Sequence, residues 1–205
     1  MKILKIIGLV VLGLIVIGAI WLFTLPTEAH LERTTTIKAP VEKVFAVIND
    51  FGQTKNWNPW MKKDPNAKYI YADNLVGAGA WYSWTSENEE VGNGRQDLLS
   101  SITNENVKTS MGFEGMTGTY TADFILKPSE EGTEVTWTFD GKGDQMMDRI
   151  FFNFSEKWLG PSYEEGLLAL AKYIEGLPDP EPEMEVETME SDSTMMEEAS
   201  EVVEE

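Results

Sequence analysis

Residues 132–140 read Gly-Thr-Glu-Val-Thr-Trp-Thr-Phe-Asp. Val135, Trp137 and Phe139 alternate with polar or charged residues, so these three side chains share one face of an extended chain. Such alternation is typical of a β-strand that has one buried face and one face in water. A turn signal, Glu-Glu-Gly at 130–132, comes just before it. This stretch therefore predicts a half-buried antiparallel strand and indicates which of its faces meets the core.

The same period of two extends back to residue 68. Turn signals at 77–79, 92–94 and 104–106 divide this region into short runs, as in an antiparallel meander with one apolar face. The side chains that share the inner face are predicted to be Ala80, Tyr82 and Trp84, then Gln96, Leu98, Ser100 and Ile102, then Val107, Thr109, Met111 and Phe113, and then Tyr120, Ala122, Phe124 and Leu126.

Helical spacing flanks this meander on both sides. Val41, Val44, Phe45 and Ile48 follow a strand-like run and a proline, and residues 50–60 form a second short helix or a tight loop. Residues 145–176 return to helical spacing, with Gly160-Pro161 as an interruption. The apolar positions of this segment are Ile150, Phe151, Phe154, Trp158, Tyr163, Leu167, Leu170 and Ile174.

A sheet with one apolar face needs a cover, and the long C-terminal helix is the only large candidate. The sequence therefore predicts an α+β fold, in which a curved antiparallel sheet wraps around that helix. A curved sheet cannot close against one helix everywhere, so we expect a cleft between the sheet, the helix and the short helical segment near Trp57. Such clefts hold apolar ligands.

An uncharged apolar segment precedes this domain at residues 6–25. Twenty helical residues span about 30 Å, the thickness of a bilayer core. We predict a single-pass transmembrane anchor in residues 1–26. Lys2 and Lys5 favour a cytoplasmic N-terminus, which places the domain on the extracytoplasmic side, although basic residues also follow the segment. A cleaved signal peptide is the alternative, but its apolar region usually has only ~7–15 residues.

The net charge of −19 comes mostly from the C-terminal end. Residues 178–205 hold twelve of the 35 acidic residues and none of the 16 basic ones. This composition predicts an acidic disordered tail, which leaves residues 27–177 as the folded domain. An acidic chain repels phosphate, so nucleic acid is not an expected partner.

Several kinds of chemistry lack the residues they need. The chain has no cysteine, which excludes disulfides and thiolate nucleophiles, and His30 is the only histidine. A zinc site would need an atypical set of carboxylates, and no phosphate-binding glycine motif is present. We therefore predict no metal site, no cofactor and no catalytic residue.

Aromatic and polar side chains on the predicted inner faces are the candidate ligand-binding residues. They are Trp57, Trp60, Tyr82, Trp84, Gln96, Ser100, Met111, Phe113, Phe124, Trp137 and Phe154. Plain core packing is the alternative for each aromatic residue. Gln96 and Ser100 need polar partners if buried, which a ligand, a water or another protein group could supply. Arg95 and Asp97 fall on the opposite face unless a bulge at Gly94 reverses them.

Motifs in a characteristic order support this fold. They are Ile37-Lys38-Ala39-Pro40, Val44-Phe45, Trp57-Asn58-Pro59-Trp60, Asp64-Pro65, Gly77-Ala78-Gly79, Tyr82-Ser83-Trp84, Gly92-Asn93-Gly94-Arg95, Gly132-Thr133-Glu134-Val135-Thr136-Trp137 and Gly160-Pro161 followed by Glu164-Glu165-Gly166-Leu167. In this order the chain resembles the START-like helix-grip superfamily (SRPBCC), of the polyketide cyclase/dehydrase and lipid-transport type. The resemblance covers roughly residues 30–176 and implies a helix-grip fold.

The superfamily includes lipid carriers, receptors and cyclases, so the resemblance alone leaves the function open. Our interpretation is a membrane-anchored, non-catalytic domain that binds a lipid-like or other apolar small molecule. One alternative is a cyclase- or hydratase-like enzyme that uses a polar group in the cleft. The other is a protein-interaction module at the membrane.

Overall fold

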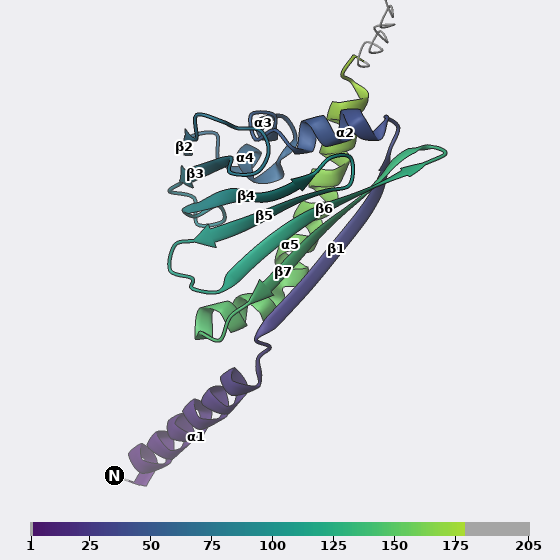
Figure 1. The fold of residues 1–205 in the computed structure, drawn as a ribbon. Coiled ribbons are helices and arrows are strands. Elements are labelled where there is room, and N and C mark those ends of the chain that lie inside the picture. The colour runs from purple at the N-terminus through teal and green to yellow at the C-terminus, as the bar shows by residue number, and fades with distance from the viewer. Residues whose placement is uncertain (1, 179–205) are drawn as a thin grey trace, which may run out of the picture.

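Seven strands form one antiparallel sheet in the computed structural model, which describes residues 2–178 (Figure 1). The strand order is β1-β7-β6-β5-β4-β3-β2, so the first strand pairs with the last and the rest form a meander. The strands are β1 (Glu28–Ile37), β2 (Lys68–Tyr71), β3 (Trp81–Thr85), β4 (Gly94–Ile102), β5 (Asn106–Phe113), β6 (Thr119–Ser129) and β7 (Gly132–Lys142).

Strand β7 has the predicted alternation. Val135, Trp137 and Phe139 are buried on the inner face. In the register of the sheet Trp137 lies opposite Arg33 of β1 and opposite Phe124 of β6. The predicted meander with one apolar face is therefore confirmed, and this face forms the wall of the core.

Four helices belong to the domain: α2 (Val41–Ile48), α3 (Thr54–Trp57), α4 (Pro59–Lys63) and α5 (Met146–Glu175). Helix α5 packs against β1 and β7 at one side of the sheet, and Arg33 of β1 donates hydrogen bonds to Glu156 and, at 2.9 Å, to Glu164 on α5. The α+β arrangement of a seven-stranded sheet with a C-terminal helix is consistent with the helix-grip fold.

The predicted interruption of the C-terminal helix at Gly160-Pro161 is wrong. Helix α5 continues through Pro161 as one 30-residue helix. Proline lacks the N–H that would bond one turn back, which bends a helix without ending it when packing holds both halves. The first turns of α5 accordingly run at an angle to the rest (Figure 1).

Strand β4 contains a bulge, which differs from the regular alternation predicted for it. The pairing with β5 shifts between Leu98 and Ser100, so Leu99 is an extra residue and the faces exchange beyond it. Leu98 is buried, whereas Ser100 and Ile102 are exposed, and Ser101 donates a 2.7 Å hydrogen bond to Asn49. The predicted place of Ser100 on the inner face is therefore wrong.

Helix α1 (Lys2–Thr24) projects away from the domain, and its side chains are largely exposed (Figure 1). Within residues 2–178 it is the one helix that is long and apolar enough to cross a membrane, and a signal sequence would have the same properties. The predicted acidic tail lies, apart from Pro178, outside the described residues.

Candidate ligand cavity

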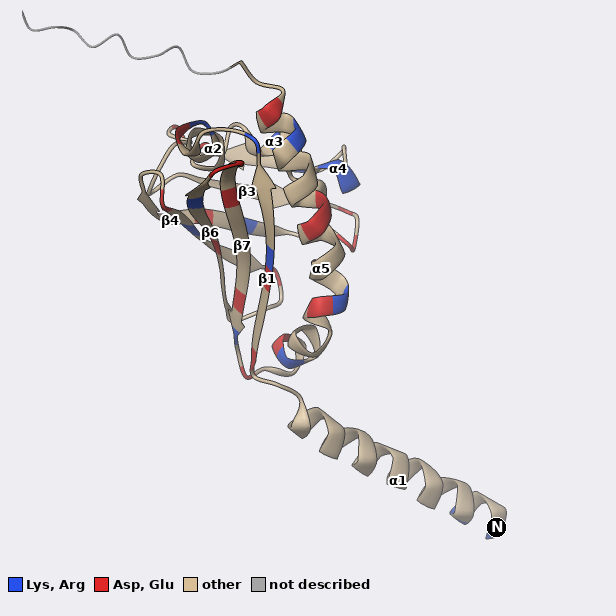
Figure 2. Ribbon diagram, turned by 90° about the vertical axis from the view of Figure 1, so that its right-hand side faces the viewer, with Lys and Arg blue, Asp and Glu red and all other residues tan. Residues whose placement is uncertain are grey.

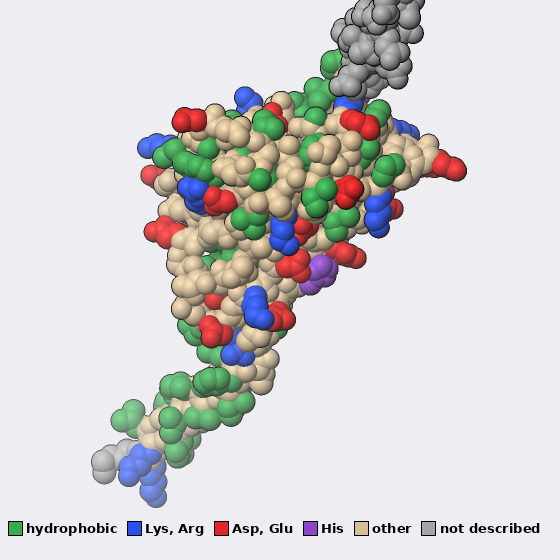
Figure 3. All heavy atoms as spheres, viewed as in Figure 1, with side chains coloured by type: hydrophobic (Ala, Val, Ile, Leu, Met, Phe, Trp, Pro, Cys, Tyr) green, Lys and Arg blue, Asp and Glu red, His purple; other side chains and the backbone are tan. Residues whose placement is uncertain are grey.

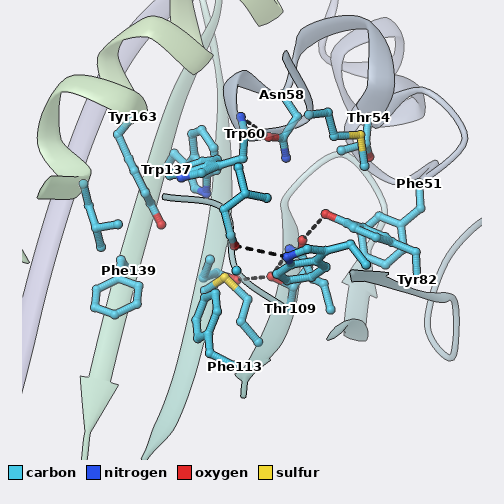
Figure 4. A pocket seen from close by; sticks show the side chains of 18 of the residues that line it. Phe51, Thr54, Asn58, Trp60, Tyr82, Thr109, Phe113, Trp137, Phe139 and Tyr163 are labelled. Carbon is cyan, nitrogen blue, oxygen red and sulfur yellow. Dashed lines mark hydrogen bonds between the residues drawn. The ribbon is translucent and has the colours of Figure 1, made fainter. Parts of the chain in front are cut away.

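A cavity of about 330 Å³ lies between the inner face of the sheet, the α3–α4 segment and α5 (Figure 4). Helix α5 packs toward the β1–β7 side, and the shorter helix α2 contacts β5 and β6, so the cavity remains between these helices and the inner faces of β4, β5 and β6. Its volume falls at the lower end of the ~300–1,000 Å³ that is usual for small-molecule sites. Most of the side chains that line it are aromatic or aliphatic.

Most of the predicted ligand-binding residues meet at this cavity. Those that line it are Trp57, Trp60, Tyr82, Trp84, Gln96, Met111, Phe113, Phe124 and Trp137. Residues that the candidate set omitted also line it, among them Phe51, Tyr69, Thr109, Phe151, Leu159 and Tyr163.

Ser100 and Phe154 do not line the cavity. Ser100 lies on the outer face beyond the bulge. Because α5 continues through Pro161, residues on both sides of the proline keep regular helical spacing. Leu159 therefore lies one turn before Tyr163 on the same side of the helix, and both line the cavity. Phe154 is rotated away from this face, and its ring centroid lies 5.3 Å from that of Trp158.

Trp137 forms the aromatic wall of the cavity. Its ring stacks on Phe124 at 4.8 Å and on Tyr163 at 4.1 Å between centroids, while Trp57 and Trp60 contact it edge to face at 5.7 and 6.0 Å. The side chain is only 5% exposed. Trp137 is therefore part of the packed core and of the cavity wall at the same time.

Glycine at position 166 allows α5 to approach this wall. A Cβ atom there would lie 2.7 Å from the Trp137 ring and 3.2 Å from Pro59. No side chain fits at such distances unless the ring moves. The Gly166-Leu167 motif that contributes to the family resemblance thus has a direct packing role.

One polar chain crosses the apolar wall. The Tyr82 hydroxyl donates to Gln96 Oε1 at 2.6 Å, Gln96 Nε2 donates to Thr109 Oγ1 at 3.0 Å, and Thr109 Oγ1 donates to the Ala122 carbonyl at 3.3 Å (Figure 4). Burial raises the pKa of Tyr82, so its hydroxyl stays neutral. Gln96 Nε2 uses one of its two hydrogens in this chain, and the second has no acceptor among the described residues.

The rim of the cavity is acidic. Glu89 and Glu90, on the loop between β3 and β4, and Glu114, which follows β5, contribute carboxylates, and Asn93 Nδ2 donates to Glu114 Oε2 at 2.5 Å. Among the lining residues in the described part of the chain there is no Lys, Arg or His. The predicted inner faces of the strands contain no Asp or Glu. These three residues lie in loops or at a strand end, where strand periodicity carries no information.

Arg95 and Asp97 lie outside the cavity, as the parity of β4 predicts. They form an ion pair with each other, with Arg95 Nε 2.9 Å from both Asp97 oxygens, and the guanidinium lies 4.0 Å from the centroid of the Trp81 ring. The bulge begins after Leu98, so it does not turn this pair inward. Arg95 and Asp97 therefore cannot supply the polar group in the cleft that the enzyme alternative requires.

His30 and Asp148 also lie away from the cavity lining. His30 contacts Asp140 at 2.7 Å on the outer face, and this hydrogen bond raises the pKa of His30. Asp148, in the first turn of α5, is buried and accepts a hydrogen bond from the Tyr120 hydroxyl. No group of three or more His, Asp or Glu side chains within residues 2–178 could hold a metal ion.

Residues 28–175 match the model of a family described as polyketide cyclase / dehydrase and lipid transport. The chain belongs to this family. The family description covers both carriers and enzymes, and it supports the binding of apolar ligands. No curated protein matches the chain.

Several solved structures resemble the fold of the chain. A protein of Chromobacterium violaceum has 17% identity and a TM-score of 0.52, over 75% of this chain and 99% of that one. A protein of Rhizobium leguminosarum has 15% identity and a TM-score of 0.54, over 72% and 95%. Norcoclaurine synthase of Thalictrum flavum has 13% identity and a TM-score of 0.56, over 72% and 94%. Identities this low establish the fold alone.

Proposed function

We propose that this protein is a membrane-anchored domain that binds an apolar small molecule without transforming it. The observation that supports this most directly is the cavity itself, about 330 Å³ of space with aromatic and aliphatic walls inside a packed domain. Protein interiors are normally close-packed, so a space of this size in the core is a specialised feature. Residues 27–177 are the binding domain, and α1 is the anchor.

The lining suggests the chemical class of the ligand. The aromatic walls suit a flat or branched apolar body. The remaining amide hydrogen of Gln96 suits one hydrogen-bond acceptor, such as a carbonyl or hydroxyl oxygen. The carboxylates of Glu89, Glu90 and Glu114 at the rim repel anions. An uncharged molecule with one or two oxygen atoms therefore fits better than a free fatty acid.

The anchor places this cavity at a lipid surface. Helix α1 has the length and composition of a membrane span, and Lys2 and Lys5 at its start favour a cytoplasmic N-terminus. The domain then lies on the extracytoplasmic side. Apolar molecules concentrate in bilayers, so an anchored carrier meets its ligand where the ligand is most abundant.

Filling the cavity tests this function. Met111 of β5 lines the cavity, and Met111→Trp places a large ring in the space. Its neighbour Ser110 lies outside the lining, so Ser110→Trp is a matched control. The measurement is solvent extraction and mass spectrometry of full-length protein purified from its host in detergent.

We expect one apolar compound in near-stoichiometric amount with the wild type and with Ser110→Trp, and its loss with Met111→Trp. Lipids that adhere to α1 occur in all three samples and cancel in the comparison. Circular dichroism checks that Met111→Trp is folded. Identical extracts from all three folded proteins would contradict the proposed function.

A further inference from the structure

The junction between α1 and the domain is fastened by side-chain contacts. Arg149, in the second turn of α5, donates to the Leu25 carbonyl through Nε at 3.1 Å and to the Phe23 carbonyl through Nη2 at 2.7 Å. The Gly143 amide donates to the Thr27 carbonyl at 2.9 Å. A guanidinium at the last carbonyls of a helix also complements its dipole. The domain is thus held in a defined orientation relative to α1.

This orientation turns the α5 side of the domain toward the membrane. In Figure 2, α5 covers one side of the sheet, and α1 extends from the lower end of the domain toward that same side. A bilayer crossed by α1 would therefore meet the outer surface of the first turns of α5 before it met the sheet. The opposite face of the sheet would point into water.

The first half of α5 carries an exposed apolar stripe. Met147, Phe151, Phe154 and Trp158 are spaced by four, three and four residues, so they lie along one side of the helix. Met147 is 55% exposed and Trp158 is 49% exposed. The Trp158 ring lies 5.3 Å from Phe154 and 6.1 Å from Phe151, between centroids. Figure 3 shows hydrophobic side chains at the end of the domain next to α1.

We propose that this stripe docks the domain onto the bilayer surface, so that the cavity faces lipid. The inference rests on the membrane anchoring proposed above. Apolar residues with tryptophan on a helix that meets the membrane–water boundary are typical of interfacial helices. Within the described residues, no other segment buries the exposed part of the Trp158 side chain. Helix α1 already brings the stripe to the membrane–water boundary. The carboxylates of the cavity rim repel anionic lipid headgroups. The apolar side chains of the stripe therefore make the contact, and anionic lipid is not needed.

The docked arrangement connects the bilayer to the cavity through one side chain. Phe151 belongs to the stripe and also lines the cavity, together with Leu159 about two turns further along α5. An apolar ligand can therefore pass between lipid and cavity along an apolar surface. Passage through water would be slower, because it exposes the ligand's apolar area.

Site-directed spin labelling of the full-length protein in phosphatidylcholine nanodiscs tests the docking. The chain has no cysteine, so a single introduced cysteine carries the only label. Met147→Cys and Trp158→Cys probe the stripe, and both sites are half exposed, so labelling there leaves the core intact. Ile15→Cys in α1 is the reference for lipid, and Lys127→Cys on β6 is the reference for water. Power saturation compares accessibility to oxygen, which concentrates in lipid, with accessibility to a water-soluble nickel chelate.

We expect the labels at 147 and 158 to prefer oxygen, as the Ile15→Cys label does but at a shallower depth, and to keep this preference in high salt. Nickel-accessible labels at 147 and 158 beside a lipid-exposed Ile15→Cys label would overturn the docking and leave the anchor standing. A nickel-accessible label at Ile15→Cys would overturn the anchor and the docking together. Spin–spin broadening between stripe labels would overturn the docking in favour of contact between two copies.

Discussion

Replacement of Trp137 by alanine is the sharpest test of the cavity wall. Phe124 and Tyr163 cover both faces of the Trp137 ring, and Trp57 contacts its edge, so the surrounding side chains lose contacts that water cannot replace. Truncating a buried tryptophan typically costs about 3–5 kcal/mol of unfolding free energy. This is a large part of the ~5–15 kcal/mol that usually stabilises a domain. We expect a loss in that range.

The assay is denaturant unfolding of the full-length protein in detergent micelles, followed by circular dichroism. Trp81→Ala is the control, because Trp81 is a partly buried residue of β3 whose ring contacts Arg95 at 4.0 Å on the outer face. A cation–π contact at such a site contributes about 0.5–1 kcal/mol, so the control should lose far less stability. A loss for Trp137→Ala no larger than that for Trp81→Ala would refute the described packing of the wall.

Two further predictions concern α5 and the outer face of the sheet. Gly166→Ala should destabilise the protein by about 1–3 kcal/mol in the same unfolding assay, because the new Cβ atom would clash with the Trp137 ring. In Gly160→Ala the new Cβ atom would contact mainly the flexible end of the Arg33 side chain, so this variant should be neutral or stabilising. Equal effects at both glycines would contradict the close approach. The pKa of His30, read from the resonances of the only histidine by NMR, should lie above its ordinary value and return toward it in Asp140→Asn. Because the pKa of His30 is higher in the folded than in the unfolded protein, its pairing with Asp140 adds a small stabilisation that is complete below pH ~6.5 and is lost as the pH rises through the folded pKa. An unchanged His30 pKa in Asp140→Asn would refute the pairing.

Much of the fold follows from periodicity. The alternation at Val135, Trp137 and Phe139 identifies both a strand and its buried face, and the structure confirms both. The helical spacing after Met146 likewise identifies the cover of the sheet. Nine of the eleven candidate ligand-binding residues line the cavity. Seven of them lie on strands of the meander, whose apolar face points to one place, and Trp57 and Trp60 come from the α3–α4 segment.

The errors have local physical causes. One inserted residue, Leu99, exchanges the faces of β4 and moves Ser100 outward, and nothing in the composition of that strand marks the bulge. Gly160-Pro161 predicts a break, but α5 continues through Pro161, and in this one helix Phe154 does not face the cavity. Thr109 was already on a predicted inner face, and its hydroxyl could have marked it as a partner for Gln96. The carboxylates of the rim come from loops, which have no period.

Photolabelling of the full-length protein in nanodiscs with an uncharged phenyl diazirine tests the central claim, apolar binding in the cavity, most directly. The probe partitions into lipid and modifies α1 in every sample, which provides an internal reference. Binding in the cavity predicts additional modification of the peptides that contain Tyr82, Met111 and Phe124, and its loss in Met111→Trp while α1 is still labelled. Labelling confined to α1, or labelling of those peptides that filling the cavity leaves unchanged, would contradict the account.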